Sequence, residues 1–245
     1  MADKHTQSHG DSEKAYGQIH RRIFEGRSAV FAVVTAVVIS IGGLVEIVPM
    51  FTAHGPEAPE GVTPYTPLEV AGRDIYVREG CYLCHSQWVR PMRAEVLRYG
   101  EWSRAVEYTY DRPFLLGSRR MGPDLHRVGG KYPDAWHFEH MRDPRSTSPG
   151  SVMPPYPWLY ERSIDPEDVA ASVRALRRVG TPYTDADVAN VSGSLQAQGQ
   201  GVVDRLSATG SQTTWDSEIV ALIAYLQRLG VDGRRMLSEQ AGDAQ

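Results

Sequence analysis

The sequence predicts a mainly α-helical protein, with a single N-terminal transmembrane helix followed by a helical domain with long loops. Three observations lead to this prediction. A long apolar run lies near the N-terminus, later segments repeat apolar residues at helical spacing, and stretches rich in proline and glycine separate them. The alternation that is typical of half-buried strands is nearly absent. The formal net charge of −4 provides no basic surface for phosphate groups, so nucleic acid is not expected as a partner.

The apolar run covers residues 28–51, and Glu46 is its only ionisable residue. At about 1.5 Å per residue it forms a helix of about 36 Å, longer than the roughly 30 Å hydrocarbon core of a bilayer. A cleaved signal peptide is the alternative, but the run is too long for one and no small-residue cleavage site follows it. We therefore expect a membrane anchor. Glu46, near the outer end, either reaches the headgroups or faces a partner helix.

Basic residues flank the span on one side. They are Arg21, Arg22 and Arg27, whereas residues 52–72 contain neither Lys nor Arg. The positive-inside rule then makes residues 1–27 a cytoplasmic tail and places the chain after the span outside the membrane. In a bacterium this outside is the periplasmic face of the inner (cell) membrane.

Beyond the span, residues 52–67 hold four prolines and two glycines and predict an extended linker. Apolar periodicity, capping residues and Gly or Pro stops predict four helices. These are residues 68–81, 134–143, 165–180 and 216–230, with Asp134, Asp165 and Asp216 as the N-caps of the last three. Residues 193–213, polar and rich in Gly and Gln, predict a surface connection or an irregular helix. We expect one outer domain of residues 68–232 and a polar tail of residues 233–245.

Both cysteines of the chain lie in the segment Cys81-Tyr82-Leu83-Cys84-His85. This is C-x-x-C-H, the pattern for covalent haem attachment, in which two thiols add to the vinyl groups and the histidine binds the iron. A structural zinc site would need two ligands from distant loops, a redox dithiol normally lies in a βαβ unit, and a disulfide leaves the histidine unexplained. We therefore expect one haem c, bound through Cys81 and Cys84, with His85 as an axial ligand.

A six-coordinate haem c needs a second axial ligand, usually Met or His. Met153 opens the stiff, proline-rich segment MPPYP, which suits it to hold a thioether at a fixed distance, and Met121 is the second candidate. Met92 is too close in sequence to reach the opposite face, while Met141 is expected in a helix and Met236 in the polar tail. A Met/His pair leaves no open coordination position, which is typical of electron transfer.

Three histidines lie further along the chain, namely His126, His137 and His140. His126 is a weaker candidate for the second axial position than the methionines. All three are expected either at the surface or beside the haem propionates.

Residues 68–230 resemble a class I cytochrome c domain. The resemblance rests on four pieces in order: an N-terminal helix before C-x-x-C-H, then GPDL, an MP loop and the C-terminal helix ALIAYLQRLG. It implies that Gly72 lies near Tyr225 where the first and last helices cross, and that the carbonyl of Pro123 orients His85.

The segments GGLVEIVPMF, GRDIYVREGCYLCHSQWVRPMRAE, GPDLHRVGGKYPDAWH and MPPYPWL closely resemble the mono-haem subunit (subunit II, CcoO/FixO type) of cbb3-type cytochrome c oxidases. The resemblance implies Met153 as the second axial ligand and a membrane-anchored, periplasmic electron-transfer subunit. Its electron donor would be a di-haem cytochrome c subunit or a soluble cytochrome c. It would pass electrons to the haem–copper catalytic subunit, where oxygen becomes water.

Residues 86–121 carry seven arginines against four acidic residues and form a longer stretch than a small cytochrome c uses there. With their aromatic residues they would form a docking face for the catalytic subunit, and a solvated Arg-rich loop is the alternative. Two other functions remain open: the cytochrome c subunit of a nitric oxide reductase, and a free-standing anchored electron shuttle. We assign no role to residues 181–213.

Overall fold

The computed structural model describes residues 18, 21–22, 26–52, 58, 60–117 and 119–242, and the chain divides into two compact units, Met1–His54 and Gly55–Gln245. The first unit contains helix α2 (Ser28–Thr52). Among the described helices, one is long and apolar enough to cross a membrane, and it covers Ser28–Pro49 of α2. The predicted apolar N-terminal helix is therefore confirmed. Most of the predicted tail, residues 1–27, lies outside the described residues.

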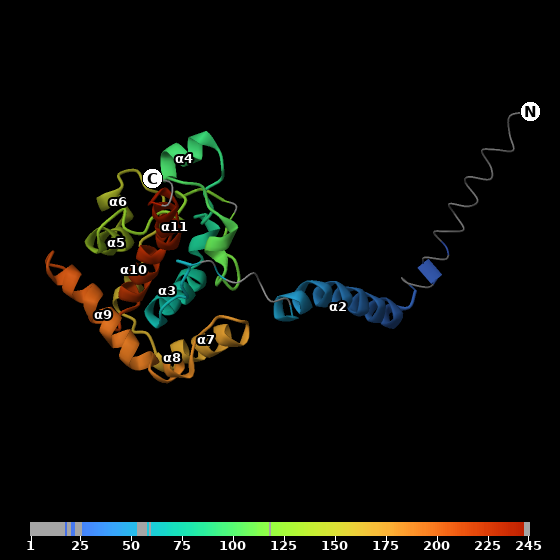
Figure 1. Cartoon of the computed structure of the whole chain (residues 1–245). Coiled ribbons are helices and arrows are strands. Elements are labelled where there is room, and N and C mark those ends of the chain that lie inside the picture. The colour runs from blue at the N-terminus through green and yellow to red at the C-terminus, as the bar shows by residue number, and fades with distance from the viewer. Residues whose placement is uncertain are drawn as a thin grey trace, which may run out of the picture. The chain divides into compact units, whose positions relative to one another are not determined.

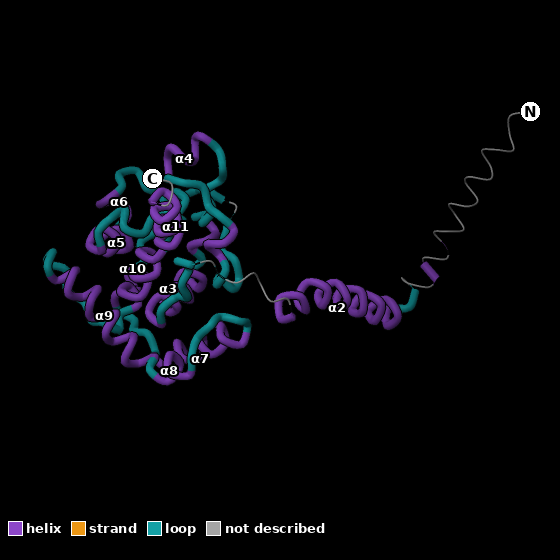
Figure 2. The backbone as a smooth tube through the Cα atoms, viewed as in Figure 1, coloured by secondary structure: helices purple, strands orange, loops and turns teal. Residues whose placement is uncertain are grey.

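The second unit consists of helices joined by long loops, and its described residues form no strand (Figures 1 and 2). Its α-helices are α3 (Pro67–Arg78), α4 (Arg93–Tyr99), α5 (Asp134–Arg142), α6 (Pro144–Thr147), α7 (Pro166–Arg178), α8 (Asp185–Ala189), α9 (Val191–Ser207), α10 (Glu218–Arg228) and α11 (Val231–Gly242). Short 3₁₀ helices cover Cys81–Leu83, Ala105–Tyr108 and Pro157–Tyr160. The mainly α-helical prediction is confirmed.

Helices α3 and α10 cross in close contact and form the centre of the hydrophobic core (Figure 1). A Cβ atom on Gly72 of α3 would lie 2.0 Å from the carbonyl oxygen of Ala221 and 2.7 Å from Cβ of Tyr225. Any side chain at this position would force the two helices apart, because packed interiors leave no such space. The predicted proximity of Gly72 and Tyr225 is confirmed. The Tyr225 ring also lies 5.4 Å from that of Tyr76, so aromatic packing stabilises the crossing.

The predicted helix starts are correct to within a residue. Asp165 caps α7, and its carboxylate accepts a hydrogen bond from the backbone N–H of Glu167 at 2.8 Å. Asp134 is the first residue of α5 rather than its N-cap, which is Pro133. Helix α10 is preceded by Ser217, one residue after the predicted aspartate.

Helix α9 corrects the prediction for residues 193–213. It is a regular helix of 17 residues with one buried face, so the surface connection is wrong, and the helical alternative is correct as far as Ser207 except that the helix is regular. The buried residues are Val191, Leu195, Gly199, Val202 and Leu206. They recur every three or four positions, and α9 packs against α3, α5, α7 and α10. At Gly199 a Cβ would lie 2.4 Å from the carbonyl oxygen of Trp215, so glycine permits this close packing.

Helix α11 extends the helical part of the chain past Asp232, the predicted end of the domain. Met236, expected in a polar tail, is only 7% exposed, so that expectation is wrong. The Asp232 carboxylate holds the first turn in place, because it accepts hydrogen bonds from Arg228 Nη2 at 2.5 Å and from the backbone N–H of Thr63 at 3.1 Å.

Candidate functional site

The two cysteines lie in a tight turn directly after α3. Glu79 ends the helix, and Gly80 adopts the left-handed φ of 70°, which starts the 3₁₀ turn Cys81–Leu83. The backbone N–H of His85 donates to the carbonyl oxygen of Cys81 at 2.9 Å. Both cysteines are half-buried free thiols, and burial raises the pKa of Cys81 to about 12. The turn therefore presents two thiols and an imidazole to one cavity.

This cavity has a volume of about 460 Å³, within the range of small-molecule binding sites. It lies between the cysteine turn, the GPDL segment, α5, the loop at residues 148–156 and α10, and its wall is largely apolar. Six of the seven residues that the sequence proposed for attachment, orientation or ligation line it, and His126 does not: the six are Cys81, Cys84, His85, Met121, Pro123 and Met153.

The His85 imidazole is fixed from two directions. Its Nδ1 lies 2.8 Å from the carbonyl oxygen of Pro123, which accepts the ring N–H and leaves Nε2 as the free nitrogen. A Cβ on Gly122 would lie 2.3 Å from Cε1 of the ring, so only glycine leaves room for it. Burial lowers the pKa of His85, which keeps the ring neutral at pH 7, as a metal ligand must be. Sequence reasoning missed the role of Gly122.

Buried hydrogen bonds join the cysteine turn to the GPDL segment. The N–H of Gly122 donates to the carbonyl of Cys84 at 3.0 Å. The Asp124 carboxylate accepts from the hydroxyl of Ser86 at 2.6 Å and from the N–H of Trp88 at 2.7 Å. These contacts set the distance at which Pro123 faces the imidazole.

The two candidate methionines differ in how firmly they are held. Met121 is 66% exposed, whereas Met153 is half-buried and packs against the hydrophobic core. The loop that carries Met153 is also tied to the cysteine turn, because the indole N–H of Trp158 donates to the Glu79 carboxylate at 3.1 Å. A ligand must be held within a fraction of an ångström, so the geometry favours Met153.

The three downstream histidines separate into two groups. His137 and His140, both on α5, line the cavity, and Nδ1 of His140 lies 2.6 Å from the hydroxyl of Thr147. His126 does not line it, because its Nε2 lies 3.0 Å from the carboxylate of Glu107. The structure therefore brings no support for His126 as an axial ligand.

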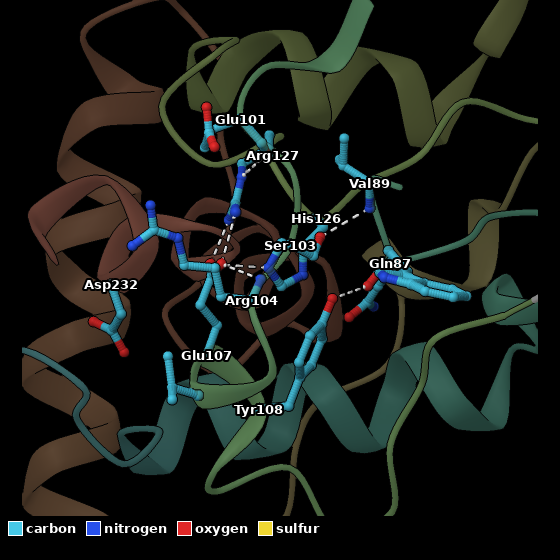
Figure 3. Close-up of polar contacts among 12 residues, drawn as sticks. Gln87, Val89, Glu101, Ser103, Arg104, Glu107, Tyr108, His126, Arg127 and Asp232 are labelled. Carbon is cyan, nitrogen blue, oxygen red and sulfur yellow. Dashed lines mark hydrogen bonds and ion pairs between the residues drawn. The ribbon is translucent and has the colours of Figure 1, made fainter. Parts of the chain in front are cut away.

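Glu107, His126 and Arg127 form a buried ion cluster that holds the 86–121 segment beside the GPDL segment (Figure 3). Arg127 donates to both carboxylate oxygens of Glu107, the longer contact being 2.7 Å. Burial alone would raise the pKa of Glu107, but the hydrogen bonds from Arg127 and His126 hold it at about 2. The segment is thus anchored in the fold and is not a loose loop.

A comparison of the chain with models of known protein families shows its family. A family model for the mono-haem subunit of cytochrome c oxidase (FixO) matches residues 20–232. The chain belongs to the FixO family. The matched region includes the cysteine turn, the GPDL segment and the Met153 loop, so these walls of the cavity lie within it. A comparison with curated proteins finds no match.

As a FixO subunit, the chain carries one haem and forms part of a cytochrome c oxidase complex. The cavity fits such a group, since it is apolar, large enough for a small molecule and fitted with a neutral, oriented imidazole. Within the described residues, no three His, Cys, Asp or Glu side chains gather so that they could hold a metal ion by themselves. A zinc site at the cysteines therefore lacks its further ligands there.

Proposed function

We propose that the chain is a membrane-anchored mono-haem cytochrome c that transfers electrons to the haem–copper catalytic subunit of a cbb3-type oxidase. Cys81 and Cys84 bind the haem covalently, His85 and Met153 are its axial ligands, and Pro123 orients His85. The observation that carries this proposal is the convergence of two thiols, an oriented imidazole and a half-buried thioether on one cavity of about 460 Å³.

When bound, the haem supplies a one-electron couple. The chain would do the rest: the Pro123 carbonyl orients the imidazole, Met153 would supply the second ligand, and the largely apolar wall would surround the macrocycle. If His85 and Met153 both hold the haem, no coordination position would be left for a substrate. Oxygen reduction would then belong to the catalytic subunit.

Exposed apolar side chains of the 86–121 segment support a docking face for that subunit. They are Trp88, Met92, Leu97, Trp102, Val106, Phe114 and Met121, the last of which also lines the cavity. Aromatic residues and Met are enriched where proteins bind each other. The buried cluster at Glu107 gives this segment the rigidity that an interface needs.

Helix α2 would anchor the chain in the inner membrane, with residues 1–27 in the cytoplasm and the haem domain in the periplasm. The apolar span Ser28–Pro49 and the arginines before it support this orientation. A di-haem cytochrome c subunit or a soluble cytochrome c would supply the electrons.

Native purification from membranes, with haem and metal analysis, tests this assignment. We expect a copper-containing partner to co-purify. A partner with non-haem iron would instead establish the nitric oxide reductase alternative. Migration of the solubilised chain as a monomer with full redox activity would contradict both and favour the free-standing shuttle.

Covalent attachment is tested separately in the double variant Cys81→Ser/Cys84→Ser. We expect no haem that resists extraction with acidified acetone, whereas the wild-type chain retains it. Haem that stays with the double variant after extraction would disprove attachment through these thiols.

A further inference from the structure

Most polar groups on the cavity wall already have protein partners. The Asp124 carboxylate accepts from Ser86 and Trp88, and Arg127 donates to Glu107. These side chains are therefore satisfied by the fold and are not available to a bound molecule.

His137 differs from them. Its side chain lines the cavity and is 2% exposed, yet its Nε2 has no hydrogen-bond partner among the described residues. A buried nitrogen left unpaired costs about 1–3 kcal/mol, so such groups are rare unless they serve a bound molecule. The nitrogen is thus available to what fills the cavity.

The ring of His137 is held in a defined orientation. It packs edge-on against Tyr132 and Trp136, with centroids 6.1 and 5.3 Å away. The start of α5 is fixed as well, because the Asp134 carboxylate accepts from Arg205 Nε at 2.7 Å and from Gln227 Nε2 at 2.7 Å. A nitrogen that is both fixed and unpaired is preorganised for one acceptor.

The chemistry of haem limits what that acceptor is. The macrocycle is apolar except for its two propionate carboxylates, which are the groups that accept hydrogen bonds at its edge. Burial lowers the pKa of His137 to about 4, so the ring is a neutral imidazole at pH 7, and it donates from Nε2 when the proton is on that nitrogen. Lys131, which is exposed and lies over the Tyr132 ring, adds a positive charge to the same wall.

We propose that the Nε2–H of His137 donates a hydrogen bond to a haem propionate and so acts as a positioning residue that raises the reduction potential. The inference rests on the proposed haem site. A hydrogen-bonded carboxylate stabilises the ferric iron less than a free one, because part of its charge is neutralised by the donor.

The test compares two variants of the full chain, purified with haem bound. His137→Leu removes the donor, and His137→Gln keeps an N–H in a similar position. We expect the leucine variant to show a lower midpoint potential and a shifted propionate bending band in resonance Raman spectra, with both near wild type in the glutamine variant. Glu139→Gln, on the same helix but away from the cavity wall, is the control and should leave the propionate band unchanged.

A wild-type potential and propionate band in His137→Leu, at normal haem content, would overturn the inference and assign the nitrogen to another partner such as a buried water. If the leucine variant does not accumulate, His137→Phe provides a second side chain without a donor. Absence of covalent haem in the wild-type chain would instead refute the proposed function, so the two failures are distinguishable.

Discussion

At Gly122 a methyl group would occupy the space of the His85 ring, since a Cβ there would lie 2.3 Å from Cε1. Gly122→Ala should therefore displace the imidazole and lower the fraction of chain that carries a low-spin haem. The measurement is the ratio of haem absorbance to protein in the purified chain. Gly201→Ala in α9 is the control, because a Cβ there meets its first neighbour only at 3.7 Å. Equal haem content in both variants would show that His85 tolerates the shift.

The two candidate methionines, Met153 and Met121, give a second prediction about single residues. Met153→Ala should abolish the weak long-wavelength absorption band that reports the iron–sulfur bond, because its half-buried thioether is held beside the cavity. Met121→Ala should keep the band, since this side chain is 66% exposed. The reverse result would assign the axial position to Met121.

Among single residues, the sequence identified those whose chemistry is fixed by spacing. Cys81, Cys84 and His85 stand out because their pattern is local. Gly122 does not, because its importance depends on the His85 ring, which comes from a distant segment. For His137 the sequence left a surface position and a place beside the propionates open, because the choice depends on the cavity wall. No periodicity or capping pattern reports such contacts.

At the scale of elements, helices with an apolar face and a clear stop could be predicted, as α7 and α10 show. Helix α9 could not, because its buried face is narrow and includes Gly199, while its other positions are polar. Its burial follows from the packing of α3 and α10, which creates the surface that it covers. Helix α11 was missed for a similar reason, since Met236 is buried in a segment of polar composition.

Glu107, in the 86–121 segment, leads to a prediction of how the stability of the fold depends on pH. The pKa of Glu107 is held at about 2, below its unfolded value near 4.5, so the carboxylate stabilises the fold above the unfolded value and loses this contribution as pH falls. A shift of this size corresponds to roughly 3 kcal/mol. The free energy of unfolding, measured by denaturant titration, should therefore fall in the wild-type protein between pH 5 and pH 3. In Glu107→Gln this fall should be clearly smaller.

Glu167→Gln on the exposed surface of α7 is the matched control for this experiment, and it should retain the wild-type slope. The same slope in all three proteins would show that the pair of Glu107 and Arg127 does not set the acid stability.

At the scale of the whole molecule, the exposed tryptophans mark the surface through which the chain would bind the catalytic subunit. Trp88 and Trp102 are 42% and 39% exposed. Replacing both with Ser should weaken binding to the catalytic subunit by about 2 kcal/mol or more, as for interface tryptophans in general, while haem content is unchanged. Co-purification from membranes measures this loss. Arg174→Ser on α7 should leave the complex intact, and an intact complex in the tryptophan variant would exclude this face.

The crossing of α3 and α10 has a consequence for biogenesis. Gly72 and Tyr225 touch in the fold but lie near opposite ends of the sequence of the second unit. The two helices therefore meet only after nearly all of the chain has been synthesised. Leu222 and Leu226 of α10 form part of the cavity wall. Until α10 docks, the cavity is open on that side, and a flat macrocycle can reach both thiols from the direction that the finished fold closes. We therefore expect the proposed haem to be loaded before α10 docks.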